Sequence, residues 1–184
     1  MENNNWKIID EKLIYANKWI RLTHYNVINP NGGEGIYGKV HFKNIAIGIV
    51  PIDEEGNTWL VGQHRLPLNS YSWEIPEGGC PLDQEPLEGA KRELLEETGL
   101  VAQDWKEILT LHLSNSVSDE KAIIYIAKNL SQQASQPDET EQLHVKKITL
   151  QKAFEMVNSN DITDAIAVAA LQKVELMLLK GELN

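Results

Sequence analysis

One segment carries the strongest structural signal in this chain: GGCPLDQEPLEGAKRELLEETGL, from Gly78 to Leu100. Its second half changes abruptly to good helix formers, and their apolar members are spaced to fall on one helical face. Pro86 suits the first position of a helix, and Gly99 suits the position that follows the last turn. The sequence therefore predicts a loop rich in glycine and proline over residues 74–85, followed by a helix over residues 86–98.

Three glutamates recur within this helix. Glu93, Glu96 and Glu97 stand at i, i+3 and i+4, which places their carboxylates on one face within a single turn. Such a face would repel itself at neutral pH, and a hard divalent cation would remove the repulsion because Mg²⁺ and Mn²⁺ prefer oxygen ligands. A solvated acidic surface is the plainer explanation. The glycine-rich loop directly before the helix favours the metal site, because its backbone groups can complete a metal and phosphate site.

Much of the remaining chain shows the alternation of apolar and polar residues that is typical of strands. Two or three short strands are expected over residues 6–29. Further strands are expected at residues 40–52, 58–62, 105–113, 121–126 and 144–148, and a polar surface loop is expected at residues 131–142. Two helices are predicted to follow, over residues 150–157 and 163–180. The pattern indicates a mixed α/β fold without internal repeats.

The composition limits the class of protein. The chain has 184 residues, of which 27 are acidic and 17 basic, so its formal net charge is −10. This balance disfavours nucleic acids and anionic membrane surfaces as partners, because both attract clustered lysine and arginine. No apolar stretch approaches the roughly 20 residues of a membrane helix, and the first residues lack the pattern of a secretory signal. We therefore expect a soluble, cytoplasmic protein.

Several other chemistries are disfavoured by spacing. Residues 33–38 fit the pattern GxGxxG, but a dinucleotide site needs a strand before it and a helix after it, whereas this context predicts a hairpin. The five histidines lack the HExxH spacing of a metalloprotease, and no serine lies in a GxSxG context. Cys80 is the single cysteine, so an intrachain disulfide and a multi-cysteine zinc site are both excluded.

The segment quoted first resembles the signature of the Nudix hydrolase family, G-x5-E-x7-R-E-U-x-E-E-x-G-U, in which U is aliphatic. Eight positions match at the right spacing: Gly78, Arg92, Glu93, Leu94, Glu96, Glu97, Gly99 and Leu100. One position departs, because the signature asks for glutamate where this chain has Gln84. In the family that glutamate braces the loop and pairs with the arginine of the signature, here Arg92. Gln84 could still form a hydrogen bond with it but no ion pair.

The resemblance implies an α/β/α sandwich around a mixed sheet over residues 41–184. An antiparallel β extension over residues 1–40 is expected before it, with a role in dimerisation. The resemblance also implies that Mg²⁺, or Mn²⁺ in its place, is held by Glu93, Glu96 and Glu97 together with the backbone carbonyl of Glu77. The family hydrolyses a nucleoside diphosphate linked to another moiety, which requires metal ions to neutralise the diphosphate, a positioned water and a base.

Other segments look like the branch of the family that cleaves ADP-ribose and nucleoside diphosphate sugars. They are GQHRLP and SWEIPEGG before the signature, and PDETEQL near residue 140. In that branch a glutamate from the loop before the last strand acts as the base, and of Glu139 and Glu141 we favour Glu139. Arg92 of the signature is also expected to take part in catalysis. The residues implied to bind substrate are Arg65, Trp73, Glu74, Ser116, Asp119 and Glu120.

The resulting expectation is metal-dependent hydrolysis of nucleoside diphosphate sugars, of the ADP-ribose and GDP-mannose type, to a nucleoside monophosphate and a sugar phosphate. ADP-ribose enzymes commonly carry a proline shortly after the signature. This chain has LSNS at residues 113–116 and no proline there, so a GDP-hexose remains an alternative substrate. By resemblance the protein is a homodimer whose N-terminal strands contribute to the partner's site. Two alternatives remain: a catalytically silent Nudix sensor of nucleotide sugars, and a hydrolase of nucleoside triphosphates or dinucleoside polyphosphates.

Overall fold

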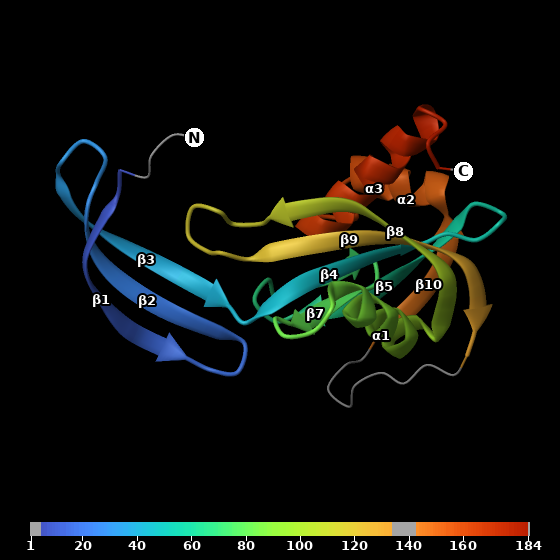
Figure 1. Ribbon diagram of the computed structural model, residues 1–184. Coiled ribbons are helices and arrows are strands. Elements are labelled where there is room, and N and C mark those ends of the chain that lie inside the picture. Colours follow the sequence, from blue (N-terminus) through green and yellow to red (C-terminus); the bar gives the residue numbers. More distant parts are fainter. Residues whose placement is uncertain (1–4, 134–142, 184) are drawn as a thin grey trace.

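The computed structural model describes residues 5–133 and 143–183. An N-terminal three-stranded antiparallel sheet, in the order β1-β2-β3, projects from the rest of the chain (Figure 1). Its strands are β1 (Lys7–Ala16), β2 (Ile20–Ile28) and β3 (Glu34–Phe42). The pattern GxGxxG begins in the turn before β3 and continues along that strand, so the expected hairpin is confirmed. The predicted boundary between residues 40 and 41 falls inside β3.

Seven further strands form two sheets. They are β4 (Asn44–Pro51), β5 (Asn57–Arg65), β6 (Ser70–Glu74), β7 (Glu77–Pro81), β8 (Leu100–His112), β9 (Lys121–Gln132) and β10 (His144–Thr149). One sheet has the order β7-β4-β9-β8 and is mixed, because β4 and β9 run parallel while the outer pairs are antiparallel. The other has the order β10-β5-β6 and is antiparallel throughout.

Helices cover both faces of these sheets. Helix α1 (Pro86–Thr98) lies on one side, and α2 (Leu150–Asn158) and α3 (Ala165–Leu179) lie on the other (Figure 1). Alternate residues of β9 serve the two sides: Ile123 packs in the core under α1, and Ile124 packs in the core under α2 and α3. The predicted α/β/α sandwich with a mixed sheet and an antiparallel N-terminal sheet is therefore confirmed.

Helix α1 begins and ends where its sequence predicts. Pro86 occupies the first turn, and Gly99 follows the last turn with a φ of 72°, in the left-handed region that glycine adopts without a steric cost. The N–H of Gly99 donates to the carbonyl of Leu95 at 2.9 Å, which closes the helix. Ala90 and Leu94 are fully buried against the sheet. The acidic face of the same helix is thus held in a fixed orientation toward β7.

Three predicted elements differ from the structure. The stretch 74–85 was expected to be a loop, but residues 77–81 form β7, which pairs with β4. This edge position tolerates glycine and proline, because only one side of β7 needs ladder hydrogen bonds. The predicted strand 40–52 is divided at Lys43, whose backbone N–H bonds to Trp19 of the N-terminal sheet while the next residues join the mixed sheet. Residues 131 and 132 of the expected loop 131–142 belong to β9, and residues 134–142 lie outside the described residues.

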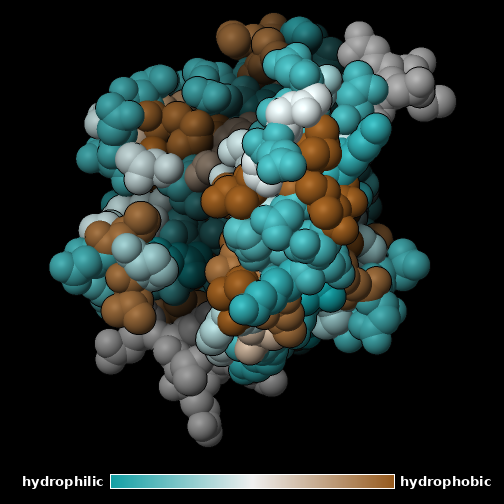
Figure 2. Space-filling view, turned by 90° about the vertical axis from the view of Figure 1, so that its left-hand side faces the viewer, coloured by the Kyte–Doolittle hydropathy of each residue, from teal (hydrophilic) through white to brown (hydrophobic). Residues whose placement is uncertain are grey.

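The N-terminal sheet is almost uncovered. Every residue of β1 is exposed, although the strand carries several large apolar side chains. Figure 2 looks at the molecule from this side and shows hydrophobic patches among hydrophilic residues. The exposed apolar residues of this part are Trp6, Ile8, Ile9, Leu13, Ile14, Tyr15, Trp19, Ile36 and Tyr37. Apolar surface on this scale is typical of an interaction surface.

None of the three helices in the described part of the chain has both the length and the apolar character that crossing a bilayer requires.

Candidate active site

A cleft of about 580 Å³ lies beside the start of β7, just before α1 in the chain. Strands β4, β5, β6 and β7 line it, together with residues after β8 and the residues that lead into α3. Its polar and charged lining residues are Asn44, Gln63, Arg65, Ser72, Glu74, Glu77, Glu120, Thr163 and Asp164. The segments GQHRLP and SWEIPEGG, which are separate in the sequence, therefore meet in one cleft.

Strand β6 divides its side chains between this cleft and the opposite face. Ser72 and Glu74 line the cleft, and both are buried. Trp73 points the other way, where it packs against the core under α2 and α3 and makes an edge contact with Tyr71 at 5.5 Å between ring centroids. Lys146 lies over the Trp73 ring, 5.4 Å from its centroid. The structure therefore does not bring Trp73 to the cleft with its neighbour Glu74.

Arg65, at the end of β5, is held by two carboxylates. Its Nε donates to Oε1 of Glu74 at 2.9 Å and its Nη2 donates to Oε2 at 2.5 Å, so this ion pair is bidentate. The same Nη2 donates to Oε1 of Glu77 at 3.2 Å. The hydrogen bond with Glu74 raises the pKa of Arg65, while burial and the charges of Asp164 and Glu74 raise the pKa of Glu77 well above its usual value. Negative charge therefore dominates this part of the cleft.

Glu97 is a buried carboxylate in the last turn of α1, with 5% of its surface exposed. Its Oε2 accepts a hydrogen bond of 3.0 Å from the backbone N–H of Glu77. A negative charge near the C-terminal end of a helix opposes the helix dipole, and burial adds a desolvation cost. Both costs would be offset by a cation, so the placement of Glu97 fits the predicted metal site.

Glu93 lies against the start of β7, in a space that only glycine leaves open. A Cβ at position 78 would collide with the Glu93 carboxylate, so Gly78 allows strand and helix to approach closely. Arg92 contacts Oε1 of Glu93 with Nη2 and Oε2 of Glu96 with Nη1, each at 2.8 Å. Its Nη2 also donates to the carbonyl of Gly79 at 2.9 Å. Arg92 thus ties two signature glutamates to each other and to β7.

Gln84 does not take the role that the signature gives to this position. Its backbone N–H donates to the carbonyl of Pro81 at 3.0 Å, which closes the turn before α1. Within residues 5–133 and 143–183, the structure shows no hydrogen bond between the side chains of Gln84 and Arg92. The reason lies in the contacts of Arg92 itself, because its guanidinium is engaged by Glu93 and Glu96.

The loop between β8 and β9 is anchored on the N-terminal sheet. Asp119 contacts Nδ1 of His41 at 2.7 Å and Nζ of Lys39 at 2.8 Å, and its other oxygen accepts from the backbone N–H of Phe42 at 3.0 Å. Burial alone would raise the pKa of Asp119, but the hydrogen bonds from Lys39 and His41 outweigh it and lower the pKa. Asp119 therefore joins this loop to β3.

The three predicted substrate residues of this loop are placed differently. Glu120 lines the cleft, where burial and the charge of Asp164 raise its pKa. Ser116 is exposed, and its backbone carbonyl accepts a hydrogen bond from the hydroxyl of Tyr37. The described contacts of Asp119 and Ser116 therefore link the loop to β3, and their role toward substrate stays a prediction.

Asp164 is a cleft residue that the sequence patterns did not identify. It caps the start of α3, because its Oδ1 accepts from the backbone N–H of Ala167 at 2.8 Å. Its place beside Glu74 and Glu77 depends on how closely α3 packs on β4. Gly48 permits this approach, since a Cβ there would collide with Ile166. A glycine inside a strand was the one local sign of such a close contact.

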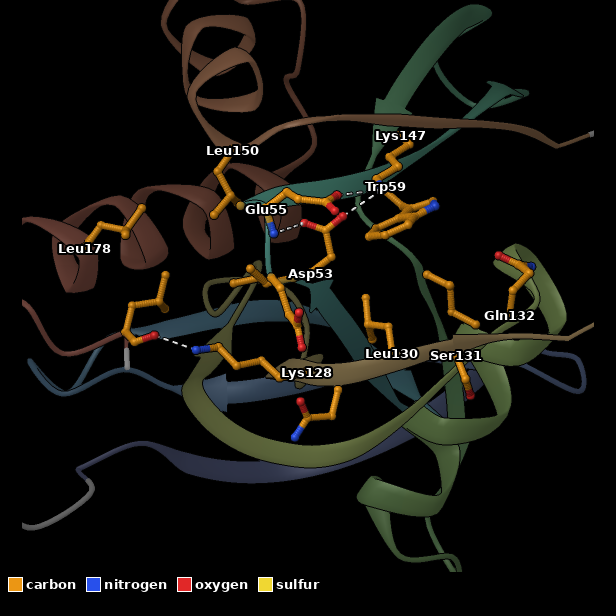
Figure 3. A pocket seen from close by; sticks show the side chains of 16 residues that line it. Asp53, Glu55, Trp59, Lys128, Leu130, Ser131, Gln132, Lys147, Leu150 and Leu178 are labelled. Carbon is orange, nitrogen blue, oxygen red and sulfur yellow. Dashed lines mark hydrogen bonds and ion pairs between the residues drawn. The ribbon is translucent and has the colours of Figure 1, made fainter.

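A second, larger cavity of about 810 Å³ lies between the β4–β5 turn, the end of β9 and the end of α3 (Figure 3). Three of its charged groups contact each other: Nζ of Lys147 lies 2.7 Å from Asp53 and 3.5 Å from Glu55. Lys147 also lies over the ring of Trp59, 5.0 Å from its centroid. The smaller cleft is the candidate active site, because Glu77 and Gly78, which contact Glu97 and Glu93, line that cleft and are absent from the described lining of the larger cavity.

Family models match nearly the whole chain. The NUDIX domain matches residues 42–169, and the nucleoside diphosphate sugar hydrolase N-terminal domain matches residues 6–40. The chain belongs to the Nudix family. The resemblance inferred from the signature is thereby confirmed. The two matches meet at residues 40–42, where the chain leaves the N-terminal sheet before β4 begins.

Some relatives match this Nudix protein over nearly its whole length. It is 32% identical over 178 residues to the ADP-ribose pyrophosphatase of Bacillus subtilis, covering 96% of each chain. It is 30% identical over 172 residues to the methanol dehydrogenase activator of Bacillus methanolicus, covering 92% of each. A crystal structure of an ADP compounds hydrolase shares the fold, with a TM-score of 0.86, 23% identity and 99% coverage of both chains.

The predicted base of this Nudix protein lies outside the described residues. Both candidates, Glu139 and Glu141, belong to the stretch 134–142. The predicted metal ligands are all described, and they present only oxygen donors. Such a donor set fits a hard divalent cation better than zinc or copper, which favour nitrogen and sulfur.

Proposed function

We propose that this Nudix protein hydrolyses the diphosphate linkage of nucleoside diphosphate sugars, ADP-ribose among them, in a reaction that depends on Mg²⁺ or Mn²⁺. The products are a nucleoside monophosphate and a sugar phosphate. The observation that carries the proposal is the meeting of the α1 carboxylates with β7 at the cleft, through the hydrogen bond between Glu97 and the backbone of Glu77. That arrangement combines oxygen ligands with a cleft of a size suited to a small-molecule ligand.

The predicted enzyme class, a Nudix pyrophosphatase, is confirmed. The family model covers most of the chain, and a full-length relative at 32% identity is an ADP-ribose pyrophosphatase. A second relative of that name, from Mycobacterium tuberculosis, is 28% identical over 95% of this chain.

Metal binding is proposed at the signature glutamates. Glu93, Glu96, Glu97 and the backbone carbonyl of Glu77 would hold the cation, which would neutralise negative charge on the diphosphate. The hydrogen bond from the N–H of Glu77 orients Glu97, and Arg92 orients Glu93 and Glu96. This chain's own residues therefore fix the ligands before any cation binds, which reduces the ordering cost of binding.

Substrate contacts are proposed at two charged residues that line the cleft, Arg65 and Glu120. Arg65 uses Nε and Nη2 for its carboxylate partners, and Nη1 takes part in neither contact, so this group can donate to a phosphate or sugar oxygen. Glu120 lies on the loop side of the cleft, where a carboxylate can accept from sugar hydroxyls. Glu139, or Glu141 in its place, is proposed as the base that accepts the proton of the attacking water.

The test is a substrate panel with purified protein and Mg²⁺. ADP-ribose, GDP-mannose and other nucleoside diphosphate sugars are compared with nucleoside triphosphates and dinucleoside polyphosphates, and the products are identified. We expect nucleoside monophosphate and sugar phosphate from the sugars at the highest kcat/KM. A clear preference for triphosphates would reject the proposed substrate class. The panel also decides whether the absent proline after the signature widens the choice of sugar beyond ADP-ribose.

A homodimer in the cytoplasm is part of the proposal. The uncovered apolar residues of β1 and β3 would be buried by a second copy, and burial of apolar surface is the main driving force of such association. The N-terminal strands would then contribute to the partner's site.

A second candidate function is regulation of another enzyme. It is favoured by the full-length relative that is a methanol dehydrogenase activator. A catalytically silent sensor has no need of the buried glutamate in the last turn of α1, so the intact set of carboxylates supports the enzyme. The substrate panel separates the two, because a silent regulator would bind nucleotide sugars without turnover.

A further inference from the structure

Three carboxylates that do not belong to α1 converge in the cleft. Glu74 lies at the end of β6, Glu77 at the start of β7 and Asp164 directly before α3. Each offers an oxygen that lies within 4.8 Å of an oxygen of the other two. Three separate elements are needed to bring them together, so the cluster is a product of the fold and not of a local acidic run.

The charges of this cluster are not balanced by its protein neighbours. Arg65 contacts Glu74 and Glu77 and supplies one positive charge. Against three carboxylates this leaves a formal charge of −2 when all three are ionised. The side chains of Glu74 and Glu77 are only 3% and 11% exposed, so water screens this charge poorly.

Glu77 adds an independent sign of an unmet contact. Its Oε1 accepts from Arg65, but its Oε2 is shielded from solvent and has no hydrogen-bond partner among the described residues. Buried polar atoms are almost always satisfied, so an unsatisfied oxygen on a carboxylate that is clustered with two others suggests a ligand with positive charge. Glu77 lines the cleft, which offers such a ligand a route of entry.

We propose that Glu74, Glu77 and Asp164 form a second divalent-cation site in the cleft, separate from the glutamates of α1. A charge of +2 balances the cluster, and three carboxylates suit Mg²⁺, Mn²⁺ or Ca²⁺ because these cations prefer oxygen ligands. The site rests on these contacts and not on the proposed hydrolysis. It also gives Glu77 two roles, since its backbone N–H supports Glu97 while its side chain belongs to the second site.

The test is direct Mn²⁺ binding to the full chain without nucleotide, followed by the electron paramagnetic resonance signal of free Mn²⁺. Asp164→Asn removes a carboxylate but keeps an oxygen that can cap α3, so the helix should persist. Asp161→Asn is the matched control, because Asp161 lies three residues earlier, is exposed and is outside the cluster. Circular dichroism checks the fold, and Asp164→Ser, which retains a cap, serves if Asp164→Asn fails to fold.

We expect Asp164→Asn to lose one bound Mn²⁺ per chain, or to weaken its binding about 10-fold or more, while Asp161→Asn binds as the unmodified protein does. Unchanged Mn²⁺ binding by Asp164→Asn would overturn the proposal. This is the result expected if a proton on Glu77, and not a cation, balances the charge of the cluster. Glu97→Gln should keep the ion that depends on Asp164. If Glu97→Gln and Asp164→Asn lose the same single ion, one shared site replaces two and the proposal fails. Binding is measured without substrate, so a failed substrate panel leaves this result intact.

Discussion

The backbone N–H of Glu77 donates a hydrogen bond of 3.0 Å to Oε2 of Glu97. This bond joins the first residue of β7 to the last turn of α1, so it links the two ends of the segment that runs from β7 through α1. The Glu77 carbonyl and the Glu97 carboxylate, both proposed metal ligands, are therefore held by neighbouring elements whose spacing is set by the packing of α1 on the sheet.

Replacing Glu97 by glutamine should remove activity and keep the fold. Glutamine has the same size, and its amide oxygen can still accept from Glu77, but it lacks the charge that binds a cation. We expect kcat/KM for ADP-ribose with Mg²⁺ to fall about 100-fold or more, measured by release of AMP. Glu88→Gln is the matched control, because Glu88 lies on the same helix with 65% of its side chain exposed. A fully active Glu97→Gln protein would contradict the metal assignment.

Adding one methyl group at Gly78 should disturb the same site from the strand side. The new Cβ would occupy the space of the Glu93 carboxylate, which must then move away from β7. We expect Gly78→Ala to need about 10-fold more Mg²⁺ for half-maximal activity. Gly38→Ala is the control, because its Cβ would meet no atom within 4 Å. An unchanged Mg²⁺ requirement would show that the Glu93 position is not needed for binding.

The elements predicted well are those with local signals. Helix α1 spans residues 86–98 as expected, because proline and glycine mark its two ends. Strand β7 was missed because its pairing with β4 is non-local and its own residues, two glycines and a proline among five, resemble a loop. The non-local pairing with β4 therefore determined the structure of this segment, although its local composition predicts a loop.

The residues of the candidate site also differ in whether a local sequence signal predicts them. The signature glutamates follow from helical spacing within one element. Asp164 was missed because its position depends on α3 packing against Gly48, and nothing near Asp164 in the sequence reports that contact. The placement of Trp73 could have been deduced, because it alternates with Ser72 and Glu74 along β6 and must face the other side.

The turn before β5 should make stability depend on pH. Burial alone would raise the pKa of Asp53, but hydrogen bonds from Lys147 and Asn57 outweigh it and lower the pKa to about 2. A depressed pKa in the folded state stabilises the fold above the unfolded value, about 4, and this contribution is lost as the pH falls through about 2. Asp53→Asn should therefore lower the free energy of unfolding at pH 7 and flatten its decline between these two pH values.

Urea unfolding at a series of pH values measures this effect. Glu54→Gln is the comparison, since Glu54 is the exposed neighbour in the same turn and should leave the pH profile unchanged. Parallel profiles for Asp53→Asn and the unmodified protein below pH 4 would contradict the assignment.

A charge placed on the N-terminal sheet should separate the proposed dimer. Ile36 is the third residue of β3 and has 72% of its surface exposed, and a second copy would bury it. We expect a mass of twice 20.8 kDa in light scattering for the unmodified protein, and a single-chain mass for Ile36→Glu at the same concentration.

Leu179→Glu is the control for this change. Leu179 is 81% exposed at the end of α3, away from that sheet, so its replacement should leave the dimer intact. If the N-terminal strands complete the partner's site, the single chain should also lose activity toward ADP-ribose while its Mn²⁺ binding persists, because the proposed metal ligands all lie within one chain. A single-chain mass for the unmodified protein at micromolar concentration would contradict the dimer and leave the apolar residues of β1 and β3 to another partner.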